Sequence, residues 1–598
     1  MTLLKSLARS GIALSALVAA AGAFAATPDP ATAGLPFAKS QSGNYLAALV
    51  ASADRDAASA AAYYSETLKA DPQNVEILGR AFASALAAGE IDKAFTLADK
   101  FVAHDPHNGL ARLALAVRAF AQGQYGQVRT QTAASQVNPR GKDLVSIMLT
   151  AWAYAGSRDE KHALETLDEI GEKALSVFKD YHAGLIADVL GDSKEASARF
   201  GRAYAADQAT LRIIDAYARV LAHQGDTEGA KKVYEDFAKT TPSHPMVEAA
   251  LADLKAGKKL EPIVHDAREG AAEALYGIGG AGRGEGDELA PLIYLRLALY
   301  LRPDHDLAAA TIADLFEQNK QPELEIAAYK LVPKNSPMRE SADIQVAIAL
   351  DALGRNAEAT ALMQKLVDSK PKDIDAVVAL ADLQRSAKSY EAAIASYDRA
   401  LALVGTPTKA NWPLFYFRGI CHERAKQWPL AEADFQKALE LYPDQPLVLN
   451  YLGYSWVDQG THLDEAFQML RKAVDLKGDD GYIVDSLGWA HFKLGHYDDA
   501  LEYMEKAVSL KAADPTINDH LGDVYWRLGR RTEAHFQWNH ARDMKPDPED
   551  LPAILKKIEE GLPDLPTPTP TPAVKAEATP APTPNATPEP SPTPSSGG

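Results

Sequence analysis

The side chains that most often bind metals or carry out catalysis are scattered through this sequence. The 598-residue chain has 15 histidines and a single cysteine, Cys421. The closest histidine pairs, His491 with His496 and His535 with His540, are five residues apart, and on a helix that spacing turns the two rings away from each other. No HExxH, GxSxG or Walker sequence is present. The sequence therefore predicts a protein that is not an enzyme, with no catalytic residue, no cofactor and no metal site.

A glycine-rich stretch, residues 277–282, matches the GxGxxG pattern of dinucleotide-binding loops. It follows a helical stretch instead of a strand, and no βαβ unit surrounds it. We therefore interpret this stretch as a flexible loop between helices and not as a nucleotide site.

The aromatic side chains indicate recognition of other proteins. Six of the seven tryptophans lie between Trp412 and Trp538. Large aromatic side chains interleaved with charges of both signs are typical of the residues that dominate protein–protein interfaces. What these side chains can do depends on the elements that carry them.

Those elements are repeats. Between Pro413 and Pro546, small residues recur in phase at steps of 34 or 35 residues. One series is Gly419, Gly453, Gly488 and Gly522, and another is Ala431, Ala466, Ala500 and Ala534. A period of 34 residues is typical of stacked helical hairpins. Small residues at a fixed step indicate the places where two helices cross closely.

Residues 518–546 show the repeat unit most clearly. Leu521, Gly522 and Tyr525 share one side of a first helix, and Trp538 lies with two alanines on one side of a second. This unit resembles the tetratricopeptide repeat. The resemblance implies an all-α, right-handed superhelical solenoid, and weaker copies along the chain bring the expected total to about 14 hairpins in two arrays.

In the tetratricopeptide repeat family, the first helix of each repeat presents side chains to a concave groove that binds partner peptides. The resemblance therefore implies a partner-binding groove in the last repeats. Its expected residues are Asn450, Tyr454, Asp458, Asp485, Trp489, Phe492, Lys493, Asp519, Asp523, Trp526 and Arg527. The alternative is that Trp489 and Trp526 are exposed incidentally or pack against the helix of the next repeat.

Composition and repeat phase divide the chain into seven segments. We expect a signal peptide over residues 1–25, a linker over 26–42, a degenerate N-terminal repeat array over 43–255, a junction over 256–287, a C-terminal repeat array over 288–548, a capping helix over 549–561 and a disordered Pro-rich tail over 562–598. The tail holds 12 of the 36 prolines, and such a composition buries too little apolar surface to fold.

The first residues are typical of an export signal. Lys5 and Arg9 precede an apolar run over residues 11–22, and Ala23-Phe24-Ala25 then matches the pattern that signal peptidase accepts. We expect cleavage before Ala26, no lipid anchor because no cysteine stands there, and a periplasmic protein associated with the envelope. No later segment is long and apolar enough to span a bilayer. The net charge of -19 disfavours nucleic acid as a partner.

A closer resemblance is carried by the sequences at residues 451–454, 485–489 and 520–523, and by the block at 269–274. They look like the bacterial envelope tetratricopeptide repeat adaptors of carboxyl-terminal processing proteases. The resemblance implies a protein partner, a carboxyl-terminal processing protease or a cell-wall hydrolase, to which the chain presents substrates. The alternative function is a scaffold for exopolysaccharide or cell-wall assembly and export.

Overall fold

The computed structural model describes residues 37–38, 40–135, 143–282 and 289–563. Within these ranges the chain forms helices and no strand, which confirms the prediction of an all-α fold. The expected signal peptide, most of the linker and all but two residues of the Pro-rich tail lie outside the described residues. None of the described helices is both long and apolar enough to cross a membrane.

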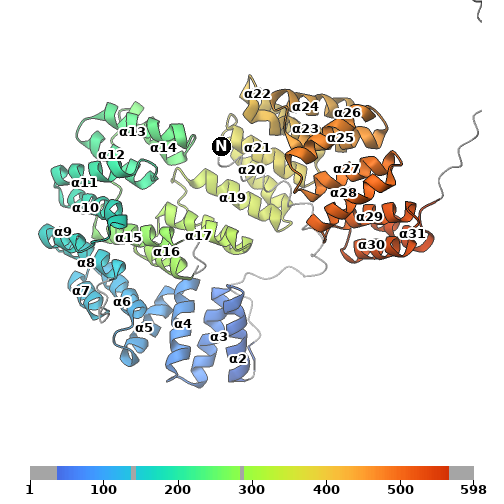
Figure 1. Ribbon diagram of the computed structural model, residues 1–598. Coiled ribbons are helices and arrows are strands. Elements are labelled where there is room, and N and C mark those ends of the chain that lie inside the picture. The colour runs from blue at the N-terminus through green and yellow to red at the C-terminus, as the bar shows by residue number, and fades with distance from the viewer. Residues whose placement is uncertain (1–36, 39, 136–142, 283–288, 564–598) are drawn as a thin grey trace, which may run out of the picture. The chain divides into compact units, whose positions relative to one another are not determined.

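The helices follow one another in pairs (Figure 1). The first six pairs are α2 (Gln41–Ala53) with α3 (Ala57–Ala70), α4 (Val75–Ala88) with α5 (Ile91–His104), α6 (Gly109–Ala121) with α7 (Tyr125–Ala134), α8 (Leu144–Gly156) with α9 (Glu160–Asp168), α10 (Ser176–Leu190) with α11 (Ser193–Ala206), and α12 (Leu211–His223) with α13 (Thr227–Thr240). A short 3-10 helix, η2 (Lys173–Leu175), precedes α10, and the single helix α14 (Pro245–Lys255) follows the sixth pair.

Eight further pairs complete the repeats. They are α15 (Ala267–Ala281) with α16 (Leu289–Leu301), α17 (Asp306–Gln318) with α18 (Pro322–Tyr329), α19 (Arg339–Ala352) with α20 (Asn356–Ser369), α21 (Ile374–Ser386) with α22 (Tyr390–Val404), α23 (Trp412–Arg424) with α24 (Trp428–Leu441), α25 (Pro446–Gln459) with α26 (Leu463–Leu476), α27 (Gly481–Lys493) with α28 (Tyr497–Leu510), and α29 (Pro515–Arg527) with α30 (Arg531–Asp543). The short helix η3 (Lys409–Asn411) precedes α23, and α31 (Leu551–Glu560) ends the described chain. Six pairs and eight pairs confirm the expected solenoid of about 14 helical hairpins.

Contacts between helices divide the chain into two compact units, residues 1–456 and 457–598. Helix α25 crosses this boundary. The seven segments inferred from the sequence stay a prediction. They follow from repeat phase and composition, whereas the two units follow from contacts between helices, so the units do not test the segments.

The glycine and alanine series of the sequence mark the closest helix crossings. A Cβ atom on Gly522 would come within 2.5 Å of the Trp538 ring, and one on Gly419 within 2.8 Å of the Phe435 ring. The alanines of the second series are fully buried: Ala431, Ala466, Ala500 and Ala534. These two hairpins thus pack a large ring of the second helix against a glycine of the first helix, which has no side chain.

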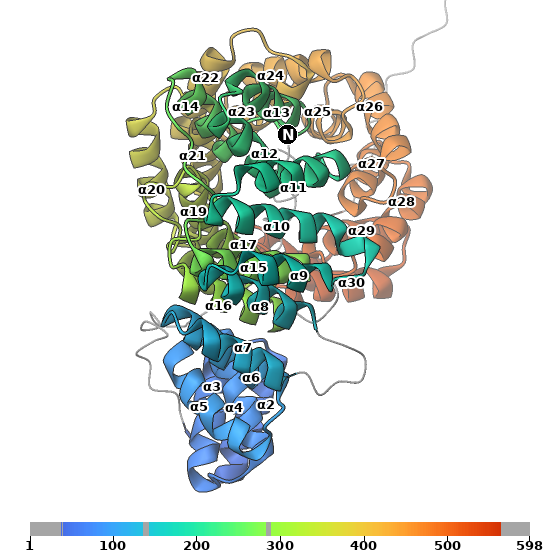
Figure 2. The same cartoon turned by 90° about the vertical axis from the view of Figure 1, so that its left-hand side faces the viewer.

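In the first unit, the chain folds back on itself after α14. Helix α15 packs against α8 and α10, and α16 packs against α4 and α6 (Figure 1). Figure 2 shows α10, α11 and α12 following one another along the array against which α15 and α16 pack. The approach is close, because a Cβ atom on Gly270 of α15 would lie within 2.2 Å of the Trp152 ring of α8.

The glycine-rich stretch at residues 277–282 is not the flexible loop that we inferred from the sequence. All but the last of these residues belong to helix α15. A Cβ atom on Gly277 would lie 2.7 Å from the Phe178 ring, and one on Gly279 would lie 3.1 Å from the Pro291 carbonyl oxygen. The loop interpretation is wrong because glycine suits both flexible loops and close contacts between helices, and here the contacts decide.

We predict that Gly488→Leu destabilises the second unit. A Cβ atom at this position would already lie 3.1 Å from Met504 and 3.2 Å from Tyr503, so a larger side chain overpacks the crossing of α27 and α28. We expect the free energy of unfolding to fall by about 1–3 kcal/mol, measured by urea denaturation. Gly109→Ala is the control, since a Cβ atom there meets nothing within 4 Å. Equal stability of the two variants would contradict the packing described here.

Candidate functional site

Helices α25, α27 and α29, each the first of its pair, carry the eleven residues expected in the groove. Helix α25 carries Asn450, Tyr454 and Asp458; α27 carries Asp485, Trp489, Phe492 and Lys493; and α29 carries Asp519, Asp523, Trp526 and Arg527. Asn450 and Tyr454 belong to the first compact unit, and the other nine belong to the second. Binding of a partner by these residues stays a prediction, but the structure shows that they differ in what surrounds them.

Two of the expected groove residues, Asp485 and Asp523, are buried, with exposed fractions of 6% and 3%. Both carboxylate oxygens of Asp485 lie 3.1 Å from Nδ1 of His520. Trp538 donates through Nε1 to Asp523 at 2.9 Å. Their assignment to the lining of an open groove is therefore corrected: these carboxylates join neighbouring helices of the second unit.

Trp489 is half-buried and stacks against two other rings. The centroids of Phe492 and His520 lie 4.7 and 3.9 Å from it, with interplanar angles of 13° and 15°. Burial lowers the pKa of His520, but the Asp485 carboxylate outweighs it, so the pKa is raised overall. The ammonium of Lys493 lies 5.5 Å from the Trp489 ring centroid, which is the geometry of a cation–π contact. We call Trp489, Phe492, Lys493 and His520 the aromatic cluster.

The aromatic cluster combines packing with accessibility. Trp489 contacts His520 on the first helix of the next repeat, which agrees with the alternative that this tryptophan packs against the next repeat. Trp489 and Phe492 are nevertheless only half-buried, and Lys493 is exposed. Lys493 also pairs with Asp458, at 3.3 Å between Nζ and Oδ1. A cation, a carboxylate and two half-exposed rings are therefore adjacent at this point.

The expected groove residues of the last repeat are covered by the end of the described chain. Trp526 donates through Nε1 to the carbonyl oxygen of Leu562 at 3.1 Å, and Arg527 donates to that of Pro563 at 2.8 Å. A Cβ atom on Gly561 would lie 1.9 Å from the Trp526 ring, so only glycine allows this approach. Trp526 and Arg527 therefore already have partners within the chain.

Helix α31 completes this cover with a half-buried lysine that pairs with two carboxylates. Lys557 donates through Nζ to Asp519 at 2.7 Å and to Asp523 at 2.8 Å. Burial lowers the pKa of Lys557, but the two carboxylates outweigh it and raise the pKa overall. The end of the solenoid thus uses the acidic face of α29 to hold its capping helix.

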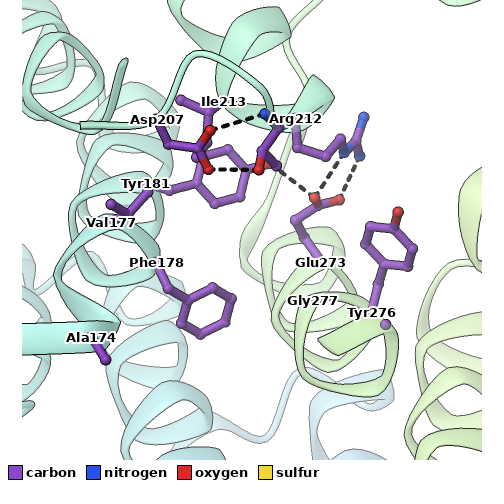
Figure 3. Close-up of a pocket in the computed structure, with 12 residues that line it drawn as sticks. Ala174, Val177, Phe178, Tyr181, Asp207, Arg212, Ile213, Glu273, Tyr276 and Gly277 are labelled. Carbon is purple, nitrogen blue, oxygen red and sulfur yellow. Dashed lines mark hydrogen bonds and ion pairs between the residues drawn. The ribbon is translucent and has the colours of Figure 1, made fainter. Parts of the chain in front are cut away.

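A second feature that could bind a ligand is a cavity of about 330 Å³ in the first unit (Figure 3). Helices α10, α12 and α15 and the turn before α12 line it. Its wall includes Phe178, Tyr181 and Tyr276 beside the charged Arg212 and Glu273. Gly277 and Gly280 of α15 leave room at this wall because they have no side chain.

Glu273 is almost fully buried at the edge of this cavity. It accepts hydrogen bonds from side chains of α10 and α12 and from the residue that precedes α17. Arg212 donates to both of its oxygens at 2.8 and 2.5 Å, and Tyr181 donates at 2.8 Å (Figure 3). Nε2 of His305 lies 3.1 Å away and donates, because its Nδ1 accepts from the backbone N–H of Ala308. This carboxylate is therefore saturated with donors and acts structurally.

The surroundings of Glu273 fix its charge. Burial alone would raise the pKa of its carboxyl group, but Arg212 and the hydrogen bond from His305 hold the pKa well below its ordinary value. Burial and this carboxylate raise the pKa of Tyr181. The side chains at this edge of the cavity thus supply neither a poised base nor a nucleophile.

The sequence alone does not distinguish Glu273 as a functional residue. The available signal was a lone acid within the alanine- and glycine-rich stretch of α15, where a charge without a partner is costly. Its partners, Tyr181, Arg212 and His305, come from three other segments, so spacing within the sequence could not identify them.

Comparison with protein families identifies the repeats. A tetratricopeptide repeat model matches residues 347–407 and 415–481, and another matches residues 484–513. These residues are therefore tetratricopeptide repeats, which act as scaffolds for protein interactions.

Known proteins match parts of the chain. A tetratricopeptide repeat-containing protein of Pseudomonas aeruginosa, PA4667, is 34% identical over 82 residues, which are 14% of this chain and 14% of that protein. Anaphase-promoting complex subunit 7 of Mus musculus is 23% identical over 271 residues, 44% of this chain and 48% of that protein. The chain thus spans less than half the length of these relatives.

Solved structures give distant matches. A tetratricopeptide repeat protein of Parabacteroides merdae has a TM-score of 0.36 at 17% identity and covers 42% of this chain and 97% of its own. A chain of the APC/C hetero-tetramer Cut9-Hcn1 has a TM-score of 0.35 at 17% identity and covers 88% of this chain and 97% of its own.

We predict that Glu273→Gln lowers the free energy of unfolding at pH 7 by roughly 3–5 kcal/mol, because it removes the carboxylate that bonds the buried Arg212 at both oxygens and leaves only the more distant Asp215, at 3.9 Å, as its countercharge. The folded pKa of Glu273 is depressed, so its stabilising effect is present above the ordinary value of about 4.5 and is lost as the pH falls below it. The difference between wild type and variant should therefore shrink in acid. Urea denaturation between neutral and acidic pH measures this.

Glu261→Gln serves as the control for that series, because the Glu261 side chain is 83% exposed. We expect this variant to follow the wild-type stability curve. A constant difference between wild type and Glu273→Gln at every pH would mean that the buried carboxylate does not carry the charge assigned to it.

Proposed function

We propose that this tetratricopeptide repeat protein is a non-catalytic scaffold of the bacterial cell envelope that presents substrates to a periplasmic protease or hydrolase. Its tetratricopeptide repeats imply protein partners. The export-type sequence at residues 1–25 supports a periplasmic location, and the resemblance around residues 451–523 supports a carboxyl-terminal processing protease as the partner.

The aromatic cluster is the observation that carries this proposal. It places two half-buried rings beside the exposed Lys493 and Asp458, so a partner could gain apolar burial and ionic contacts at one point. Trp526 and Arg527, which the sequence places in the same groove, already bind the backbone of Leu562 and Pro563. We therefore assign the partner's main contact to α27 and not to the last repeat.

The second candidate function is a scaffold for exopolysaccharide or cell-wall assembly and export. The export-type sequence at residues 1–25 and the tetratricopeptide repeats favour this function as much as they favour the first. Crosslinking of the full chain in the cell envelope, followed by identification of the crosslinked proteins, separates the two functions. A protease or hydrolase supports the first function, and components of a polysaccharide synthase support the second.

We predict that Trp489→Ala and Lys493→Glu each weaken binding of the crosslinked partner by about tenfold or more, because few aromatic and charged side chains usually dominate an interface. The Lys493 variant changes an exposed side chain, so its thermal unfolding should match the wild type. Phe536→Ala is the matched control, because this ring on α30 is 60% exposed and lies outside the expected groove. Calorimetry with the purified partner gives the affinities, and undiminished binding by both variants would refute the assignment to α27.

We predict that the mature protein begins at Ala26 and is released with the periplasmic fraction. The reason is the charged, apolar and small-residue succession in residues 1–25. Fractionation and N-terminal sequencing of the native protein measure this. A cytoplasmic chain that still begins at Met1 would exclude the envelope function.

A further inference from the structure

We propose that His491, His496 and Asp499 form a binding site for a divalent transition-metal ion such as Zn²⁺. The three residues lie at the turn between α27 and α28, in the second unit. One ligand atom from each residue lies within 4.8 Å of the other two. Two imidazole nitrogens and a carboxylate oxygen are a donor set that suits Zn²⁺ and related ions.

The turn brings the two histidines together. The expectation that this pair diverges is wrong, because the two residues do not share a helix: α27 ends at Lys493 and α28 begins at Tyr497. Gly495, with φ of 80°, reverses the chain between them. The backbone N–H of His496 donates to the carbonyl oxygen of His491 at 2.9 Å, which places the start of α28 beside the end of α27.

His491 is the fixed donor of the site. It is 5% exposed, and neither of its ring nitrogens has a hydrogen-bond partner among the described residues. Its ring is held by Phe467, at 4.6 Å between centroids, and by the stacked ring of Tyr503, at 5.4 Å. Buried polar groups are nearly always satisfied, so the two nitrogens of this buried ring, which bond to nothing within the described residues, are available to bind a ligand.

His496 and Asp499 are the other two donors of the site. Both are exposed, and Asp499 Oδ2 lies 3.6 Å from Nδ1 of His491. Zn²⁺ has bonds of about 2.0–2.2 Å to nitrogen and oxygen, so two of its tetrahedral ligands are about 3.3 Å apart. Small rotations of two exposed side chains are therefore enough to bring the three donors around one ion, and a fourth position stays open.

At the corresponding positions two repeats earlier, the buried histidine has a hydrogen-bond partner within the chain. His422 occupies the place of His491, and its Nδ1 lies 2.7 Å from the side-chain oxygen of Gln427, which occupies the place of His496. Leu430 occupies the place of Asp499. There the buried histidine is satisfied by an amide, whereas at α27 the amide and the leucine are replaced by two further metal ligands.

The test is a titration of the untagged full chain with ZnCl₂ in a calorimeter, repeated with CoCl₂ to record the visible absorption of a bound Co²⁺ ion. We expect one ion per chain and a thermal unfolding temperature that rises with the Zn²⁺ concentration. His496→Ala and Asp499→Asn should each weaken Zn²⁺ binding by at least about tenfold. Both positions are exposed, so these variants should unfold like the wild type when no metal is added.

His540→Ala is the matched control, because His535 and His540 have the same spacing but lie on one helix, α30. This variant should keep the wild-type affinity and the Co²⁺ spectrum. The proposal is overturned if the wild type binds no Zn²⁺, or if His496→Ala and Asp499→Asn bind it as tightly as the wild type does. These outcomes do not depend on the identity of a protein partner.

Discussion

Two helices can cross closely only where one of them has almost no side chain, and both compact units depend on this constraint. In the second unit it places Trp538 over Gly522 inside the last hairpin. In the first unit it lets α15 approach α8, with Gly270 against the Trp152 ring. The same rule therefore applies to crossings within a hairpin and also allows a later hairpin to return to earlier ones.

The sequence predicts the parts of the fold that depend on contacts between near neighbours. The hairpins could be found because Gly522 and Trp538 lie in one repeat, so their spacing recurs with the period. The return of α15 could not be found, because Trp152 belongs to a helix far upstream and no period connects the two segments. For that reason the sequence alone does not distinguish the glycines at residues 277–282 from a flexible loop.

For the candidate site, the sequence predicts which helix carries each residue but not what covers that residue. The repeat phase placed Trp489 and Trp526 on the first helices of their repeats, as the structure has them. It could not predict their exposure, because that depends on what packs over each helix. His520 lies against Trp489, and Gly561 and Leu562 lie against Trp526. The last contact involves a segment after the repeats, to which the repeat period does not apply.

The buried polar groups of this protein differ in whether the chain satisfies them, and that difference separates structural groups from groups that could bind a ligand. Glu273 has a low exposed fraction and accepts from Tyr181, Arg212 and His305, so its charge is used to join helices. His491 has a similarly low exposed fraction, but its ring nitrogens have no hydrogen-bond partner among the described residues. Both side chains are buried. Only at His491 is the bonding capacity of the buried group still open, and two further donors lie within reach of it.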